Sequence, residues 1–392
     1  MGQRNSVYGF RCLPSLLRPE SRGRLTLKSS DPFDPPAIVA NYLEKPEDVQ
    51  LLIRGIEECK KIVSSEPLKD IGAELTEKTP AKSCAHLKYE SDQYWECLLK
   101  LRPLTIYHPV GTCKMGPKDD PTSVVDPELS HFSSYWPRGR ALGGTSSING
   151  MQYVRASRHD YDRWAKYTNS EGWDYHHVLP YFKKLEDTQI EGIQNSVYRG
   201  KGGPIPVNRI KSQPLAQTIV EAAQKVGYPL NEDHNGQTME GVAHSQVNAK
   251  DDERWSSSRS YIHPILNRPN LHVAVNSLVQ KIVLKDKKAV GVEVIKDNRK
   301  FTIGVRREVI LSAGAIGSPQ ILMLSGVGPK KHLEELKIPV VSDLPVGDNL
   351  QDHLFFDLGV TIREPMSSPF NSLKSWSTYL KYKILGTGTY YV

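Results

Sequence analysis

A glycine-rich segment from Pro137 to Asp162 constrains most strongly what this chain can fold into. Gly143 and Gly144 are paired in it, and the hydroxyl residues Thr145 and Ser146 follow directly. Paired glycines let backbone N–H groups approach a ligand without interference from a Cβ atom. Successive N–H groups of such a turn bind anions, most strongly where a helix begins.

The residues around the glycine pair strengthen this interpretation. Arg138 and Arg140 precede it and add positive charge, and a small polar run, Asn149-Gly150-Met151-Gln152, follows it. The segment therefore predicts a site for a diphosphate or another electron-rich cofactor. The alternative is an ordinary Gly/Ser connection between two elements.

Composition and charge limit the class of protein. A chain of 392 residues with 38% hydrophobic and 24% charged residues is typical of a globular protein of two or three domains. The net charge of +7 is spread along the chain, and its densest part, 281–307, interleaves acids and is typical of a solvated hairpin. We therefore expect no nucleic-acid partner. The uncharged run 309–329 contains Pro319 and several glycines, which favours a strand, turn and helix over a transmembrane segment.

The cysteines indicate neither a zinc site nor a disulfide framework. The five of them form no Cys-x-x-Cys pair, and their number is odd. We therefore expect no metal site, free thiols and a reducing compartment, so that an intracellular location is favoured.

Apolar periodicity predicts several helices. Pro46 opens a helix whose apolar positions include Val49, Leu52 and Ile56 at helical spacing. Further helices are expected over 92–101, 160–166, 175–185, 215–226 and 330–336, and strands rich in Val and Ile over 24–27, 271–284 and 289–295.

Two other stretches carry candidate chemistry. His108 lies in a loop beside proline, where a neutral imidazole can serve as a general base; a plain turn histidine is the alternative. Residues 308–312 predict a buried strand that runs into Ala313-Gly314, with Ser318 as the cap of the next helix and Pro319 as its first residue. A strand, tight turn and helix N-terminus in this order places a cofactor at the carboxyl edge of a parallel sheet.

Taken together, these stretches resemble the glucose–methanol–choline family of FAD-dependent oxidoreductases. Residues 139–162 are similar to its first motif, 314–328 to its second, and 108–113 to the loop of its active-site histidine. The resemblance implies an α/β fold: an FAD-binding Rossmann-like domain and a substrate domain with an antiparallel sheet and helices. It also implies hydride transfer from a choline- or glucose-like alcohol to the flavin and onward transfer to an electron acceptor.

The resemblance also assigns roles to residues. His108 matches the base that removes the hydroxyl proton. Val279 matches a backbone contact to adenine, and Ala313 and Gly314 match the closing turn of the cofactor domain. The residues that match the flavin-facing segment are Arg140, Gly143, Gly144, Thr145, Ser146, Asn149, Gly150, Met151 and Gln152. A mitochondrial location is compatible with the resemblance.

The order of the family's regions is rearranged in this chain. Residues 14–129 resemble part of its C-terminal region, and residues 130–392 resemble its N-terminal FAD-binding region, which implies a join near Ser130. No Gly-x-Gly-x-x-Gly turn is present, so the first βαβ unit of the cofactor domain is lacking. The alternative to an active flavoenzyme is therefore a non-catalytic remnant or a fusion of two tandem copies that does not hold FAD stably. Trp95 and Trp255 are candidates for a cationic-substrate cage or, alternatively, for core packing.

Overall fold

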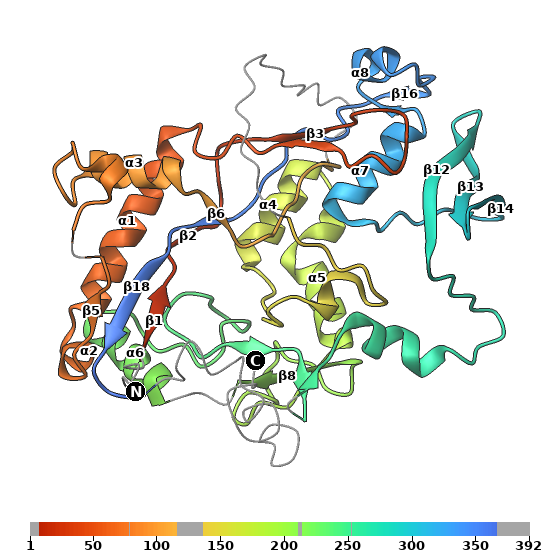
Figure 1. Cartoon of the computed structure of the whole chain (residues 1–392). Coiled ribbons are helices and arrows are strands. Elements are labelled where there is room, and N and C mark those ends of the chain that lie inside the picture. Colours follow the sequence, from red (N-terminus) through yellow and green to blue (C-terminus); the bar gives the residue numbers. More distant parts are fainter. Residues whose placement is uncertain (1–7, 78, 116–135, 211–213, 252, 367–392) are drawn as a thin grey trace, which may run out of the picture.

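The computed structural model describes residues 8–77, 79–115, 136–210, 214–251 and 253–366. Within these ranges, helices and mostly small antiparallel sheets alternate along the chain (Figure 1). The segments at the two ends of the described chain run side by side through the middle of the molecule. The mixed α/β composition expected from the sequence is confirmed.

The helices follow the predicted periodicity closely. The first begins at Pro46, with acidic residues in its first turn and lysines in its last, as the helix dipole favours. The α-helices are α1 (Pro46–Val63), α2 (Glu66–Asp70), α3 (Asp92–Leu101), α4 (Arg158–Thr168), α5 (Tyr175–Leu185), α6 (Pro214–Lys225), α7 (Gly314–Leu324) and α8 (Lys330–Glu335). Shorter helical turns are η1 (Lys82–Cys84), η2 (Gly144–Ser147), η3 (Glu171–Trp173), η4 (Ser258–Ile262) and η5 (His263–Ile265).

Strands from the beginning and the end of the described chain pair with one another. In one three-stranded sheet β18 lies between β1 and β5, and Cys12 lies opposite Leu358. In a second sheet β17 lies between β2 and β6, and Leu354 lies between Leu16 and Thr105. The strands concerned are β1 (Tyr8–Cys12), β2 (Ser15–Leu16), β5 (Glu74–Leu75), β6 (Leu104–Thr105), β17 (Leu354–Phe355) and β18 (Leu358–Ile362). The two sequence regions are therefore joined by backbone hydrogen bonds.

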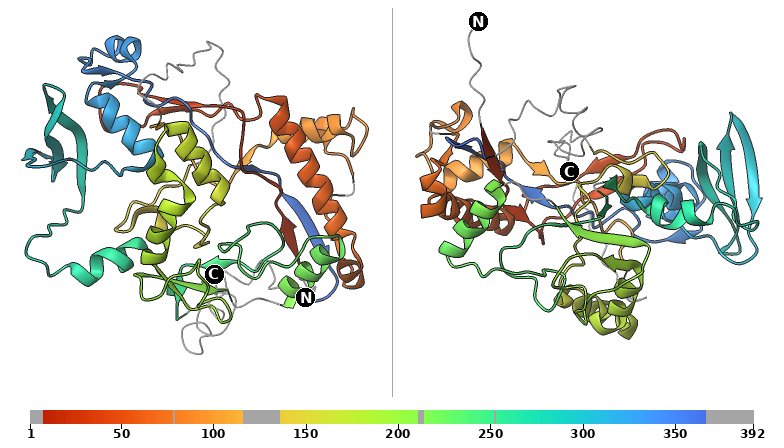
Figure 2. Two further views of the ribbon diagram at one scale, coloured as in Figure 1. Left: turned by 180° about the vertical axis from the view of Figure 1, so that it is seen from behind. Right: turned by 90° about the horizontal axis from the view of Figure 1, so that it is seen from below.

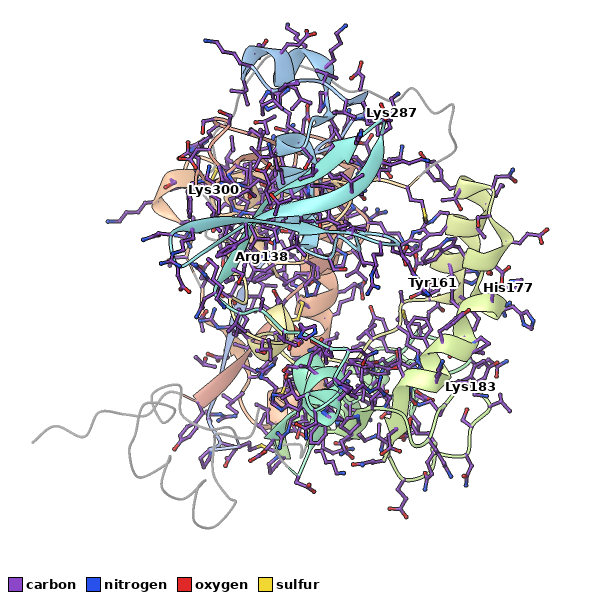
Figure 3. The ribbon with its side chains drawn as sticks, turned by 90° about the vertical axis from the view of Figure 1, so that its right-hand side faces the viewer. Arg138, Tyr161, His177, Lys183, Lys287 and Lys300 are labelled. Carbon is purple, nitrogen blue, oxygen red and sulfur yellow. A yellow bond between two sulfur atoms is a disulfide. The ribbon has the colours of Figure 1, made fainter. Side chains whose placement is uncertain are left out.

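The remaining strands form smaller pairings. They are β3 (Arg24–Thr26), β4 (Ala37–Val39), β7 (Glu186–Thr188), β8 (Ile205–Arg209), β9 (Gln246–Val247), β10 (Ala249–Lys250), β11 (Glu253–Arg254), β12 (Ser277–Lys285), β13 (Lys288–Lys296), β14 (Arg299–Gly304), β15 (Val327–Gly328) and β16 (Ser342–Asp343). The antiparallel sheet β12-β13-β14 stands at one end of the molecule (Figure 2). Lys287 and Lys300 are exposed on it (Figure 3), as expected for a solvated hairpin, although β14 was not predicted.

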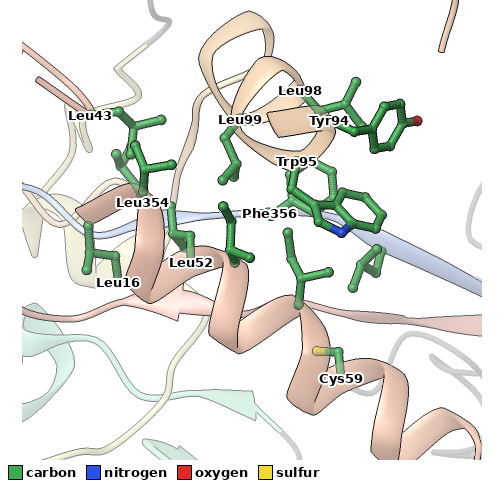
Figure 4. Close-up of a cluster of buried hydrophobic side chains, with 14 of the residues drawn as sticks. Leu16, Leu43, Leu52, Cys59, Tyr94, Trp95, Leu98, Leu99, Leu354 and Phe356 are labelled. Atoms are coloured by element: carbon green, nitrogen blue, oxygen red, sulfur yellow. The ribbon is translucent and has the colours of Figure 1, made fainter. Parts of the chain in front are cut away.

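The main hydrophobic core combines both sequence regions. Ile56 of α1 and Leu98 of α3 are buried against Leu354 and Phe356, which lie about 250 to 300 residues later (Figure 4). Trp95 is part of this core, which confirms its packing role. A second core joins Leu25 and Leu27 to Met323 of α7, Leu333 of α8, Ile338 and Val346. Both of these cores therefore combine residues of the two sequence regions.

The expectation of free thiols is wrong for four cysteines. Disulfides link Cys12 to Cys59 and Cys84 to Cys97, whereas Cys113 is free and exposed. Sequence spacing did not reveal these pairs because packing creates them: β18, which pairs with β1, packs on α1, and η1 folds back on α3. Both Cα–Cα distances are 6.1 Å, within the range that a disulfide spans.

The expected buried strand over 308–312 does not form. The side chain of Ile310 is 79% exposed, and α7 begins at Gly314, so that Ser318 is not its cap and Pro319 lies inside it. In a doubly wound sheet such an apolar segment is covered by neighbouring parallel strands. Among the described residues the parallel pairs are only β7 with β8 and β15 with β16, so the segment finds no partner. No helix in the described part of the chain has the length and apolar character needed to cross a membrane.

Peptide mapping under non-reducing conditions tests the disulfides. We expect linked peptides for Cys12–Cys59 and Cys84–Cys97, with alkylation only at Cys113. In the chain-entropy account, closing loops with sequence separations of 13 and 47 stabilises the fold by roughly 3 to 4 kcal/mol each. Reduction should therefore lower the melting temperature of the wild-type chain markedly and that of a Cys113→Ser control equally. Full alkylation of native, unreduced protein would contradict the pairing.

Candidate active site

The loop of His108 is held against the segment 349–353 by backbone pairing. Val110 and Gln351 exchange both of their backbone hydrogen bonds at 2.9 Å. Gly111 has φ +94°, and a Cβ there would overlap the carbonyl oxygen of Asn349. Glycine is therefore required for this close approach. The side chain of His108 is exposed.

The carboxylate of Asp352 is the centre of this site. It is only 2% exposed, and its Oδ1 accepts the backbone N–H of His108 at 2.8 Å. Its Oδ2 accepts the hydroxyl of Tyr42 at 2.8 Å and the hydroxyl of Thr105. A carboxylate can be buried when donors of this kind satisfy its oxygens. Burial and then this neighbouring charge raise the pKa of Tyr42 far above its ordinary value, so Tyr42 stays a donor.

His353 lies directly beside the candidate base. The Nδ1 atoms of His108 and His353 are 3.3 Å apart, and their ring centroids are 5.4 Å apart at 70°. Burial, and then the nearby His108, lower the pKa of His353, which keeps that ring neutral at neutral pH.

The glycine loop is docked on the segment 254–258. Gly143 has φ +93° and precedes the helical turn η2. The Ser146 hydroxyl donates to the carbonyl of Gly143 and accepts the N–H of Ser257 at 2.9 Å, and Asn149 Oδ1 accepts from Arg254 at 2.8 Å. These two side chains thus build the loop itself. Thr145 is exposed, and its hydroxyl accepts the backbone N–H of Gly139 at 3.3 Å.

The start of α7 brings the predicted motifs together. Arg138, from the glycine loop, donates to the carbonyl of Ala313 at 3.1 Å, and Thr112, from the His108 loop, donates to that of Ala315 at 2.6 Å. Gly314 between them has φ +78°, and a Cβ there would overlap the Arg138 guanidinium. Arg138 lies on the side of the molecule that carries the sheet β12-β13-β14 (Figure 3).

This arrangement fits one side of an FAD site. The N-terminus of α7 has no side-chain cap and no acid in its first turn, so its N–H groups and Arg138 suit a diphosphate. Beside the glycine loop, Ser258 Oγ and Asn248 Nδ2 are buried without a partner. Such orphaned groups mark a place for a polar ligand. Among the described residues, no three or more His, Cys, Asp or Glu side chains gather as metal ligands.

The other predicted cofactor residues lie near the glycine loop or near α7. Met151 is buried, and its backbone pairs with Asn248, while Val279 lies on β12, which packs on α7. Arg140, Gly150 and Gln152 are exposed on or just after the loop. Their contacts to a cofactor remain predictions, as does the role of His108.

Sequence reasoning missed Asp352, Thr112 and the partnership of His353 with His108. The segment 346–353 lies some 240 residues from His108 in the sequence, and no periodicity signals that distance. The role of Asp48 was also missed: it is fully buried and accepts the N–H groups of Glu20 and Ser21.

Two family models match the chain and establish its class. The N-terminal model of the GMC oxidoreductases matches residues 105–355, well over half of the chain, and their C-terminal model matches residues 19–133. The chain therefore belongs to the GMC oxidoreductase family, whose cofactor is FAD. The C-terminal match comes first, as the rearranged order predicted. The two matches overlap over 105–133, so a domain boundary at 129–130 remains a prediction.

Curated relatives are choline dehydrogenases. The mitochondrial choline dehydrogenase of Mus musculus is 49% identical over 222 residues, which are 56% of this chain and 37% of that protein. The oxygen-dependent choline dehydrogenase of Brucella anthropi is 42% identical over 261 residues, or 66% of this chain and 46% of that protein. The chain thus spans less than half the length of these relatives.

Solved structures agree with the family. An FAD-dependent oxidoreductase from Chaetomium thermophilum superposes with a TM-score of 0.51 at 33% identity, covering 53% of this chain and 38% of that one. Pyridoxine 4-oxidase from Mesorbium loti superposes with a TM-score of 0.50 at 30% identity, covering 53% and 41%. The part of the family fold that this chain contains is therefore recognisable.

Replacing Asp352 tests the central carboxylate. Asp352→Ala leaves two hydroxyls and two backbone N–H groups without their acceptor, so the free energy of unfolding should fall by on the order of 3 kcal/mol. The pKa of Tyr42 should move back toward its ordinary value, because the raising charge is gone. Denaturant unfolding and ultraviolet titration measure the two effects, with the exposed Glu191→Ala as control. Unchanged Tyr42 titration in Asp352→Ala would refute this arrangement.

Proposed function

We propose that the site oxidises the CH–OH group of a small alcohol by hydride transfer to FAD, with His108 as the proton acceptor. The observation that supports this most is the convergence at α7: the His108 loop and the glycine loop both bond to its first residues through Thr112 and Arg138. A base and a cofactor cradle are thereby fixed to one helix.

His108 supplies the acid–base part of the reaction. Its imidazole accepts the hydroxyl proton of the alcohol while its backbone N–H is held by Asp352. Bound FAD supplies the acceptor for the carbon-bound hydrogen. The residues that would hold it are Arg138, Arg140, Gly143, Gly144, Thr145, Gly150, Gln152, Val279 and Gly314, with Ser146, Asn149, Met151 and Ala313 supporting the loop and turn from behind.

A choline-like alcohol is the substrate class that the relatives favour, because both curated proteins cited above are named for choline. An electron acceptor must then reoxidise the flavin. The mouse relative is named as mitochondrial, and the two disulfides favour a compartment in which thiols are oxidised. We therefore propose an oxidising compartment in place of the reducing one expected from the cysteine count.

A non-catalytic chain is the second candidate, and the segment 308–312 favours it. That segment, for which the sequence predicts a buried strand, carries the exposed Ile310, and the sequence has no Gly-x-Gly-x-x-Gly turn. Half of the diphosphate cradle is therefore not encoded in these residues, which weakens FAD binding.

Purified chain distinguishes the two candidates. An active flavoenzyme takes up FAD, becomes yellow and reduces a dye when it is given choline. His108→Ala should then slow dye reduction by about 10²- to 10⁴-fold, the typical contribution of a general base, and leave FAD affinity unchanged. The exposed His86→Ala serves as the matched control.

Two results decide against the first candidate. If FAD added at saturating concentration quenches no protein fluorescence and co-elutes with no protein, the non-catalytic reading holds. If FAD binds but His108→Ala reduces dye as fast as wild type, the base is a different residue.

A further inference from the structure

A histidine joins the end of β3 to α8. Leu27, the first residue after β3, donates its backbone N–H to Nε2 of His332 at 3.0 Å. His332 lies within α8, and both segments are found in the upper part of Figure 1. The two residues are 305 positions apart, so this bond connects the two sequence regions of the chain.

The direction of this bond follows from the chemistry of its two atoms. A backbone N–H can only donate, so Nε2 of His332 must carry a lone pair. A ring of this kind is neutral and holds its single hydrogen on Nδ1. An imidazolium carries a hydrogen on both nitrogens and has no acceptor, so protonation of His332 removes the bond.

The bond lies at the second hydrophobic core. Leu25 and Leu27 are buried there with Met323 of α7 and Leu333 of α8. Leu27 is only 6% exposed, so its N–H has little access to water once Nε2 no longer accepts. A buried N–H without a partner is unfavourable, and loss of the acceptor therefore favours separation of the strand end from α8.

Charged groups on both sides of the bond respond to a proton on His332. Arg24, on β3, disfavours a second positive charge, whereas Glu335, on α8, favours one. Asp348 faces Arg24 from the segment after β16, and burial raises the pKa of its carboxyl. When acid neutralises Asp348 as well, Arg24 is left uncompensated beside an imidazolium.

The other elements packed at this core add little charge. Neither α7 nor β4 contains a charged residue. On β16, Asp343 Oδ1 accepts the backbone N–H of Lys330 at the start of α8 at 2.9 Å. The balance at His332 is therefore set by burial, Arg24 and Glu335.

Burial lowers the pKa of His332, in agreement with the acceptor role of its Nε2. In the unfolded chain the ring has its ordinary pKa of about 6.5 and takes up a proton more readily. The bond therefore contributes fully to stability above about pH 6.5, and this contribution is lost as the pH falls below that value.

We propose that Nε2 of His332 and the N–H of Leu27 form an acid-sensitive latch, which holds the end of β3 on α8 when the ring is neutral and releases it when the ring is protonated. The latch is a property of the folded chain and does not depend on the proposed function.

Hydrogen bonds connect the latch to the candidate active site. The N–H of Leu25 donates to the carbonyl of Gly347 at 2.7 Å, and the N–H of Gly347 donates to that of Thr112 at 2.8 Å. Thr112 in turn donates to Ala315 at the start of α7. Release of the strand end is therefore expected to loosen one attachment of the backbone that holds the His108 loop against α7.

Hydrogen exchange at the amide of Leu27 tests the latch in the full chain without cofactor. The exchange rate is measured from about pH 7.5 to about pH 5 and divided by the intrinsic rate of an unfolded amide, while nitrogen-15 NMR follows the protonation of His332. Protection of Leu27 should fall by on the order of tenfold as His332 takes up its proton, because a buried N–H loses its acceptor.

Three variants isolate the role of the ring. In His332→Gln the amide oxygen can accept the N–H of Leu27 but does not titrate, so protection of Leu27 should stay constant over this pH range. His332→Leu offers no acceptor and should lack this protection at every pH. His86→Gln, at an exposed histidine, should lose protection of Leu27 in acid as the wild type does.

The outcomes decide for or against the latch. It is overturned if His332 takes up its proton while Leu27 stays protected, or if the ring stays neutral until the whole chain unfolds. An equal loss in acid in His332→Gln also overturns it, because acid then acts elsewhere. Loss of protection in the wild type together with constant protection in His332→Gln supports it, whether or not His332→Leu folds and whether or not the chain takes up FAD.

Discussion

The segment from Val346 to Leu358 carries the interactions on which the rest of the structure depends. It supplies β17 between two strands of the early chain, Phe356 to the main core and the buried carboxylate of Asp352. A buried anion is tolerated only when donors surround it, and these donors come from residues 42, 105, 108 and 353. Electrostatics and packing therefore fix the His108 loop to a segment far along the chain.

The opposite side of the site is less complete. The glycine loop and the start of α7 form a cradle with an uncapped helix N-terminus, Arg138 and orphaned polar groups behind the loop. Next to it, Ile310 is exposed, and the sheet β12-β13-β14 lies at one end of the molecule with only β12 packed on α7. A hydrogen-bonding cradle can form locally, but a central strand needs neighbours on both edges. The same chain thus combines a well-anchored candidate base with a partly built candidate cofactor site.

Local patterns predicted elements well and long-range partners poorly. The boundaries of α3 and α5 and the start of α1 were predicted because apolar periodicity, caps and proline act within a few residues. Residues 308–312 were predicted wrongly because an apolar run becomes a strand only when another strand pairs with it. The disulfides were missed because cysteine spacing does not show which helices pack together.

The sequence by itself determined the family, the three motifs and their rearranged order, since each motif is a short run of residue types with a local chemical reason. Only the tertiary structure decided that Asp352 anchors His108, that His353 faces it and that Thr112 and Arg138 meet at α7. These contacts join residues that lie between about 175 and 245 positions apart. The physical reason is that a buried charge and a shared core select their partners by position in space, which is fixed only after both regions have packed.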